Sequence, residues 1–398
     1  AENRVRLEDL QTAGQIDEVG ENELKEVSRS ICFIDKEIND LFDERWIAAL
    51  ERLGLLPNFT LLDDVVDLKV GLRSRNITTG EYEFDTREYQ RGLASALYEL
   101  APGNSFYVQG TRADIDAVDL GRDRGDLQEW RVCPSCSYME TVASDRTTGA
   151  GCPECGEAAF YGLEQVLDVL PLRRVSSEVT QGEAGISDRT EDRVSRHYTM
   201  AEGCTIPEGG RGTTWFTKNL GFGAAVLNDV ELRWLDLGSR SHASGGLGGA
   251  NEPKIIGGRE HNAPLFTVCD YCGRVPAYGN TDKRYGHRPW CIHRTSGEDH
   301  NTSFVLGRTL RTQGVLLYLP RFMTAADGLA VPSLTAAIML GFKQVLGGDP
   351  QHLGVSIVQV AAKEGAPPSA ALLLHDRVPG GTGYLTQFSS AEDVRSLL

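Results

Sequence analysis

The sequence predicts a multi-domain α/β protein, and three observations lead to that fold class. The chain has 398 residues, which is enough for two or three domains. Seven of its nine cysteines gather in two short clusters of the kind that hold zinc. Beyond residue 303, short apolar runs alternate with one helical run. The expected architecture is a zinc-ribbon insertion followed by a C-terminal α/β zinc-binding domain.

Composition limits the classes of protein to consider. Hydrophobic residues make up 40% of the chain and charged residues 24%, as in ordinary soluble proteins. No stretch approaches the roughly 18–20 apolar residues of a membrane span, so no membrane partner is expected. CxxC pairs without a visible signal peptide fit a reducing compartment, which favours a cytoplasmic location. The chain begins with Ala in the middle of an acidic helical pattern, so we expect a piece of a longer polypeptide.

Patterning along the chain suggests five segments. These are an acidic helical linker at 1–57, a small α/β domain at 58–130, a zinc ribbon at 131–160, a β-rich segment with a Gly/Ser loop at 161–260, and a zinc-binding α/β domain at 261–398.

The N-terminal half is expected to mix helices and strands. Residues 22–56 have helical apolar spacing that Pro57 ends. Residues 60–72 are strand-like, and a helix is predicted over 86–100 with Thr86 as its N-cap. Short β segments are expected over 104–120, and a flexible Gly/Ser loop over 238–258.

The C-terminal part predicts a compact α/β unit over 303–388. Three apolar runs suit strands buried on both faces and sharing one sheet: Phe304 to Leu319, Val355 to Val360 and Ala370 to Leu374. A helix from Ser333 to Leu346 would cover that sheet. A glycine turn at 380–383 would end the last strand, before a final helix over 391–398.

The first cysteine cluster has the spacing of a zinc ribbon. Cys133 and Cys136 form one CxxC pair, and Cys152 and Cys155 form a second pair after a short loop. Four protein thiols leave no open position for water, so the sequence predicts a structural zinc and not a catalytic one. The alternatives are a redox dithiol or cysteines without a ligand.

The second cluster leaves its fourth ligand open. Cys269, Cys272 and Cys291 supply three thiols, and the fourth ligand is His287, His293 or neither. His287 is favoured because its separation from Cys291 is typical of zinc fingers, whereas Cys291 and His293 are only one residue apart. One or two structural zinc ions are therefore expected in the chain. Loop cysteines beside a basic loop are the alternative.

Charge is distributed unevenly. The net charge is −16, which excludes a general nucleic-acid coat. Residues 1–50 hold thirteen acidic and six basic side chains, whereas a basic stretch surrounds and follows the second cluster. We predict that this stretch contacts DNA phosphates without sequence preference. The candidate residues are Arg284, Arg288, Arg294, Arg308 and Arg311. Solvated arginines or internal ion pairs are the competing interpretation.

Several catalytic motifs are missing from the sequence. It has no Walker A loop, no acidic ATPase box, no H-E-x-x-H and no G-x-S-x-G. The turn from Pro379 to Gly383 is only superficially like a phosphate loop, since it lacks a lysine. A hydrolase that uses His375 and Asp376 beside this turn is kept as a third hypothesis.

The stretch from Ala371 to Tyr384 resembles the signature of the C-terminal zinc-binding region of mitomycin-repair-type superfamily 2 DNA helicases. Gly54–Phe59, Arg91–Gly103, Arg308–Leu319 and Ser333–Val345 also resemble segments of that family. The resemblance implies ATP-driven movement on DNA, in DNA repair or anti-phage defence, with a zinc held by cysteines. The motor domains, and with them ATP, would lie upstream or on a partner chain. A scaffold that docks such a motor without touching DNA is the alternative.

Overall fold

The computed structural model describes 65–75, 82–142, 149–180, 197–217, 221–239, 252–276, 286–288, 290–295, 300–325, 328–346, 351–361, 367–388, 390 and 392–394. The helix predicted over 22–56 and most of that over 391–398 lie outside these residues. Residues 268–302 belong to one compact unit, and residues 62–267 with 303–398 belong to another. The second cysteine cluster is therefore in a different unit from the C-terminal strands, unlike the single 261–398 domain that we expected.

The described part of the chain is mostly β, which corrects the predicted α/β class. Its helices are α4 (Leu93–Glu99), α6 (Arg321–Ala325) and α7 (Ala330–Leu346). The strands are β1 (Val65–Arg75), β2 (Tyr82–Gly92), β3 (Ser105–Val108), β4 (Thr111–Asp114), β5 (Ala117–Val118), β6 (Gln128–Val132), β7 (Met139–Thr141), β8 (Val166–Pro171), β9 (Arg174–Thr180), β10 (Tyr198–Thr205), β11 (Arg211–Phe216), β12 (Gly223–Ser239), β13 (Glu252–Ile256), β14 (Arg259–Ala263), β15 (Phe266–Cys269), β16 (Asn301–Tyr318), β17 (Leu353–Val360) and β18 (Ser369–Asp376).

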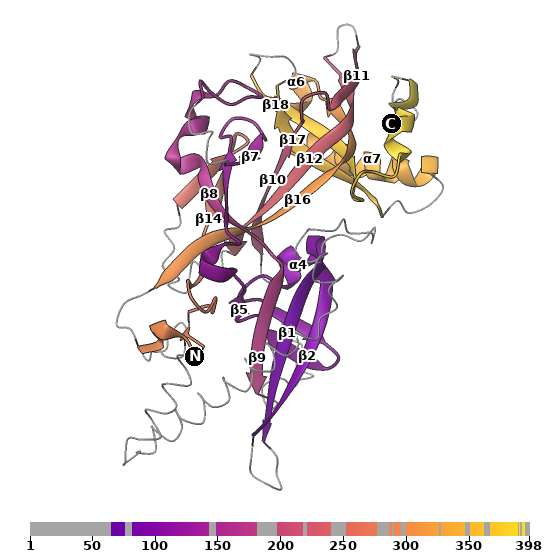
Figure 1. Ribbon diagram of the computed structural model, residues 1–398. Coiled ribbons are helices and arrows are strands. Elements are labelled where there is room, and N and C mark those ends of the chain that lie inside the picture. The colour runs from indigo at the N-terminus through magenta and orange to yellow at the C-terminus, as the bar shows by residue number, and fades with distance from the viewer. Residues whose placement is uncertain are drawn as a thin grey trace, which may run out of the picture. The chain divides into compact units, whose positions relative to one another are not determined.

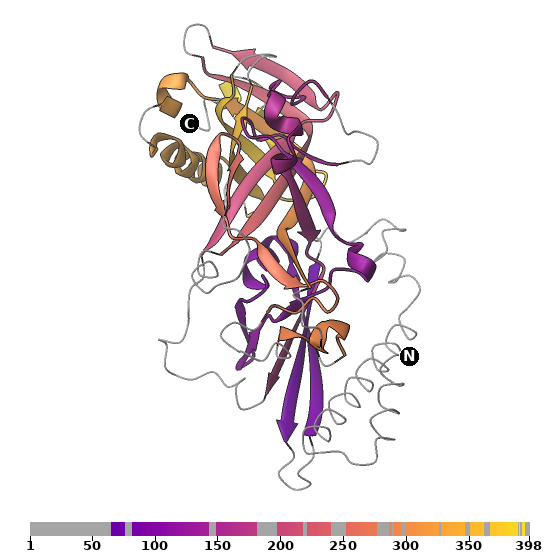
Figure 2. The ribbon, with the colours of Figure 1, turned by 90° about the vertical axis from the view of Figure 1, so that its left-hand side faces the viewer.

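The helix predicted over 86–100 is half strand. β2 pairs antiparallel with β1 along its full length, from Val65 opposite Gly92 to Arg75 opposite Tyr82 (Figures 1 and 2). The helix begins only at Leu93, with Gly92 as its N-cap in place of Thr86. The helical spacing of buried residues starts there as well, at Leu93, Ala96 and Leu97. Pairing with β1 outweighs the local helical pattern over the first seven residues.

Two long strands organise the larger sheet. β12 and β16 run antiparallel for most of their 17 and 18 residues (Figure 1). Toward one end they carry β10 on one side and β8 on the other, and toward the other end they carry β11 and β18. β6 pairs with β8, so residues from three of the five predicted segments share this single ten-stranded sheet.

The prediction that the three C-terminal strands share one sheet is confirmed. β16 pairs with β18, and β18 pairs with β17, both antiparallel. One face of these strands packs on α7 and η7 (Tyr384–Phe388), through residues such as Ile338, Phe342 and Leu372. The opposite face forms a second core that includes Leu316, Val358 and Leu373. Burial on both faces explains why these runs are continuously apolar.

Part of the predicted Gly/Ser loop is ordered strand. β12 extends to Ser239, and β13 pairs with β14 in a hairpin that turns at Gly257 and Gly258. Both glycines have positive φ, at 59° and 72°, where side chains with a Cβ are disfavoured. None of the helices in the described residues is both long and apolar enough to cross a membrane.

Candidate metal centres

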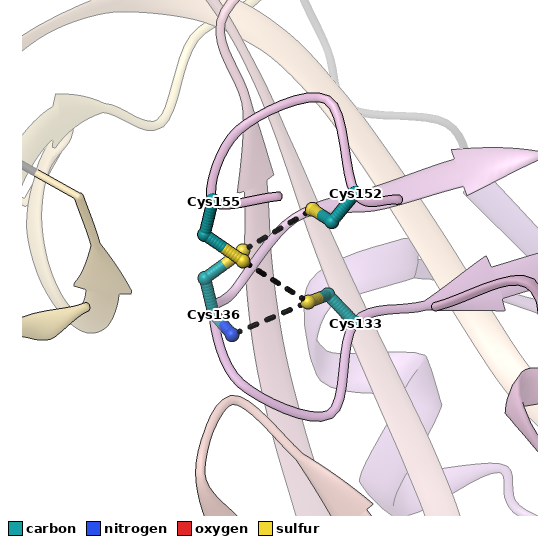
Figure 3. Close-up of side chains that lie close together, drawn as sticks. All are labelled: Cys133, Cys136, Cys152 and Cys155. Carbon is teal, nitrogen blue, oxygen red and sulfur yellow. Dashed lines mark hydrogen bonds between the residues drawn. The ribbon is translucent and has the colours of Figure 1, made fainter. Parts of the chain in front are cut away.

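The first cysteine cluster forms a compact tetrad. One pair follows β6 and the other precedes η2 (Ala158–Tyr161), and the four sulfur atoms converge on one point (Figure 3). Sγ of Cys133 lies 3.6 Å from Sγ of Cys155, and Sγ of Cys136 lies 3.6 Å from Sγ of Cys152. A disulfide would bring two sulfurs to about 2.05 Å. A tetrahedral zinc with Zn–S distances of about 2.3 Å would hold them roughly 3.8 Å apart, so the spacing fits zinc.

The backbone around this tetrad supports thiolates. The N–H of Cys136 donates to Sγ of Cys133 at 3.4 Å, and Gly156 closes the second pair at a φ of 77°. In the metal-free cluster, a hydrogen bond from Cys136, followed by one from Cys152, lowers the pKa of Cys133 to about 2. The same bond to Cys133 raises the pKa of Cys136. The four thiols therefore compete for negative charge, and a divalent cation would let all of them ionise.

The first knuckle is fastened to two separate strands through Ser137. Its N–H donates to the carbonyl of Gln359 at 2.7 Å, and its carbonyl accepts from the N–H of Cys204 at 2.8 Å. Its hydroxyl accepts from the N–H of Gln359 at 2.7 Å. Ser137 thus joins β17 to β10, the two strands that meet where the sheet curls. The sequence gave no signal for this role, because the spacing of cysteines says nothing about the residues between them.

The β13–β14 hairpin also holds this knuckle. The N–H of Gly257 donates to the carbonyl of Cys133 at 3.0 Å, and the N–H of Gly258 donates to the carbonyl of Pro134 at 2.6 Å. A Cβ on Gly257 would lie 3.2 Å from the Ser137 hydroxyl, so the close approach favours glycine. The ribbon is therefore built into the sheet and does not stand apart as an independent insertion.

The second cluster brings together three thiols and one imidazole. Cys269, Cys272, His287 and Cys291 offer ligand atoms that all lie within 4.8 Å of one another. Sγ of Cys269 and Sγ of Cys291 are 3.7 Å apart, and Nδ1 of His287 lies 3.6 Å from Sγ of Cys291 and 3.9 Å from Sγ of Cys272. Zinc with typical bond lengths would set a sulfur–nitrogen spacing of roughly 3.6 Å. The geometry favours His287 as the fourth ligand.

His293 also lies near this cluster but in a different group. Its Nδ1 is 3.6 Å from Sγ of Cys269 and 3.1 Å from Oδ1 of Asp270. The atoms of Cys269, Asp270 and His293 lie within 4.8 Å of one another and form a second set of candidate ligands. The sequence analysis weighed His293 and missed Asp270, although its position directly after Cys269 was a usable signal.

The predicted DNA-binding arginines do not form one exposed group. Arg288 and Arg308 are buried, with 4% and 8% of their surface exposed, so neither presents a free guanidinium to phosphate. Arg308 packs over the ring of Trp234 at 4.9 Å. For these two residues the interpretation as internal arginines is correct and the DNA-contact prediction is wrong.

The remaining three arginines have different positions. Arg311 has an exposed side chain but forms a two-pronged ion pair with Asp229. Arg294 is half-buried in η6 (Ile292–Thr295), and Arg284 lies outside the described residues. Arg294 and Arg311 belong to different units. The prediction of DNA contact remains open for these three.

The proposed His375–Asp376 hydrolase site has the geometry of a turn instead. The Asp376 carboxylate accepts from the N–H of Val378 at 3.0 Å and the N–H of Thr382 at 2.6 Å, and also from the Thr382 hydroxyl. The His375 ring lies 3.3 Å from the Ser356 hydroxyl, and both side chains are buried, with 4% and 3% exposed. Burial lowers the pKa of His375 to about 4. These groups scaffold the glycine turn and are not open to a substrate.

Comparisons with known proteins add one distant likeness. No protein-family model matches the sequence, and no curated protein matches it. A solved structure described as "Crystal Structure of DUF1998 helicase MrfA bound to DNA" is similar over 81% of this chain, with 10% sequence identity and a TM-score of 0.29. The chain spans 28% of the length of that helicase chain. A likeness of this size does not establish a shared fold, so the chain is distantly similar to part of a DNA helicase.

Proposed function

We propose that the chain is a non-catalytic region stabilised by two structural zinc ions. The observation that carries this proposal is the 3.6 Å spacing of the sulfurs in the first cluster. The first ion would be held by Cys133, Cys136, Cys152 and Cys155, and the second by Cys269, Cys272, His287 and Cys291. Both sets fill all four positions of a tetrahedron with protein ligands, which is typical of structural zinc. The first ion would hold the knuckle through which Ser137 joins β10 to β17.

The region would serve an ATP-dependent DNA helicase or translocase in the cytoplasm, in DNA repair or anti-phage defence. Support comes from the sequence resemblance of residues 371–384 and of the segments named with it. This chain lacks the ATPase motifs, so the motor would lie upstream or on another chain and would bind the ATP. The chain itself would engage the DNA that the motor moves.

DNA contact would involve phosphates and the remaining candidates Arg284, Arg294 and Arg311. Arg311 would exchange its pair with Asp229 for a phosphate, and exposure of both side chains makes that exchange inexpensive. Phosphate contacts release counterions, so the affinity should fall steeply with salt.

A scaffold that docks the motor without touching DNA is the second candidate. The burial of Arg288 and Arg308 favours it, because it removes two of the five predicted phosphate contacts. The net charge of −16 also opposes DNA binding by the chain as a whole.

The two candidates differ in the salt dependence of DNA binding. With the motor present, Arg284→Ala/Arg294→Ala/Arg311→Ala should lower the log–log salt slope by roughly two to three if the chain touches phosphates. Arg122→Ala serves as the control, since its side chain is 97% exposed and lies outside the predicted stretch. An unchanged slope in the triple variant would favour the scaffold.

A further inference from the structure

Asp270 and His293 face the Cys269 thiol beside the second zinc cluster. Nδ1 of His293 lies 3.6 Å from Sγ of Cys269 and 3.1 Å from Oδ1 of Asp270. The side chains are 28% and 15% exposed, so the group is largely shielded from water. Neither Asp270 nor His293 belongs to the set that includes His287.

The geometry of this pair is that of ligands sharing a cation. Oδ1 of Asp270 is buried and has no hydrogen-bond partner within the described part of the chain, although it lies 3.1 Å from the imidazole nitrogen. The two atoms are close but not aligned as donor and acceptor. Zinc bound to sulfur, nitrogen and oxygen would set a sulfur–nitrogen spacing of roughly 3.6 Å and a nitrogen–oxygen spacing of roughly 3.3 Å. The observed distances match both within a few tenths of an ångström.

We propose that these three residues hold a second metal ion in this cluster, with the Cys269 thiolate bridging it to the first. The ion would be zinc, since sulfur, imidazole and carboxylate are all zinc ligands. A thiolate sulfur has lone pairs for two metals. Three protein ligands leave one tetrahedral position open, and a water molecule would occupy it, as in zinc sites that do chemistry.

Charge balance supports the second ion. The three thiolates and the Asp270 carboxylate carry four negative charges, and one zinc ion leaves two of them uncompensated. A second zinc ion makes the group neutral, which reduces the cost of burying it. Arg274, which donates to the carbonyl of His287 at 3.2 Å, and the buried Arg288 are the competing source of compensation. The arginines can offset charge but leave Oδ1 of Asp270 without a partner.

Metal content per chain separates the arrangements. Purified full chain in excess Zn²⁺, then passed through a desalting column, is expected to retain three zinc ions by elemental analysis. Asp270→Asn/His293→Gln should retain two. Glu260→Gln/His261→Gln is the matched control, because it changes an adjacent acid and histidine that belong to neither cluster, and it should retain three.

A wild-type content of two, unchanged in the Asp270/His293 variant, would overturn the bridged site and leave the two structural zinc ions intact. A content below two would contradict the two-zinc proposal itself. If the variant fails to fold, X-ray absorption of the zinc-loaded wild type decides. A bridged pair should give a zinc–zinc contribution at roughly 3.5–4 Å, the separation typical of two-metal sites. Its absence would overturn the proposal.

Discussion

Ser137 and Gln359 are 222 residues apart in the sequence and hydrogen-bond to each other twice. The Ser137 N–H donates to the Gln359 carbonyl, and the Gln359 N–H donates to the Ser137 hydroxyl, both at 2.7 Å. A residue of the first zinc knuckle thereby takes the place of a strand between β17 and β10. The metal site and the curl of the main sheet are one structural element.

Ser137→Ala should reduce the free energy of unfolding by about 1–3 kcal/mol, because the N–H of Gln359 loses its acceptor in a buried position. Urea denaturation with zinc present measures the change. Ser135→Ala is the control in the same knuckle; its hydroxyl bonds to Glu157 at 2.5 Å in a more exposed setting, so it should cost less. Equal stability of the two variants would show that the Ser137 hydroxyl does not hold the strands together.

Cys133→Ser/Cys136→Ser should lose one zinc ion per chain and unfold the local ribbon. The binding free energy of a small zinc unit is on the order of 10 kcal/mol and is coupled to folding. Because Ser137 lies between these cysteines and the sheet, hydrogen exchange should quicken at the amides of Cys204 and Gln359 as well. Cys204→Ser is the control for metal content, since Cys204 is buried in the apolar core and belongs to neither cluster. Unchanged zinc content in the double variant would refute the site.

Asp236→Asn should stabilise the protein at neutral and alkaline pH. Burial raises the pKa of Asp236 to about 8, only partly opposed by the N–H of Gly238, and Oδ2 has no partner among the described residues. The native state therefore holds a proton that the unfolded chain releases near pH 4. This stability is fully present below about pH 4 and is lost, at up to about 1.4 kcal/mol per pH unit, as the pH rises to about 8.

Asparagine keeps the acceptor for Gly238 but cannot ionise, so the variant should show a flatter stability profile between about pH 5 and pH 8 in urea denaturation. Asp119→Asn is the control: this carboxylate is partly exposed beside Arg174. A wild-type profile that is already flat over this range would contradict the prediction.

Gly381→Ala should destabilise the protein more than Gly380→Ala. Both glycines have positive φ, at 78° and 77°, so each substitution should cost about 1 kcal/mol of backbone strain. A Cβ on Gly381 would also lie 2.9 Å from the Gln313 side-chain oxygen, whereas one on Gly380 would meet no atom within 4 Å. Thermal unfolding of the two variants measures the difference. Equal melting temperatures would show that Gln313 moves aside freely.

The sequence by itself determined the features that depend on local spacing. Cysteine separation identified both metal clusters and favoured His287, and continuous apolar runs located β16, β17 and β18 in one sheet. These signals are reliable because a zinc knuckle and a strand buried on both faces each impose their pattern on neighbouring residues.

Tertiary structure alone decided the rest. Pairing with β1 made residues 82–92 a strand despite their helical spacing. Packing turned Arg288 and Arg308 from exposed candidates into buried side chains. Ser137 met Gln359, and Asp270 met His293, because chain segments far apart or folded back in space share one site. Such contacts depend on which surfaces meet when the sheet curls and the loops close, and a linear pattern does not record that.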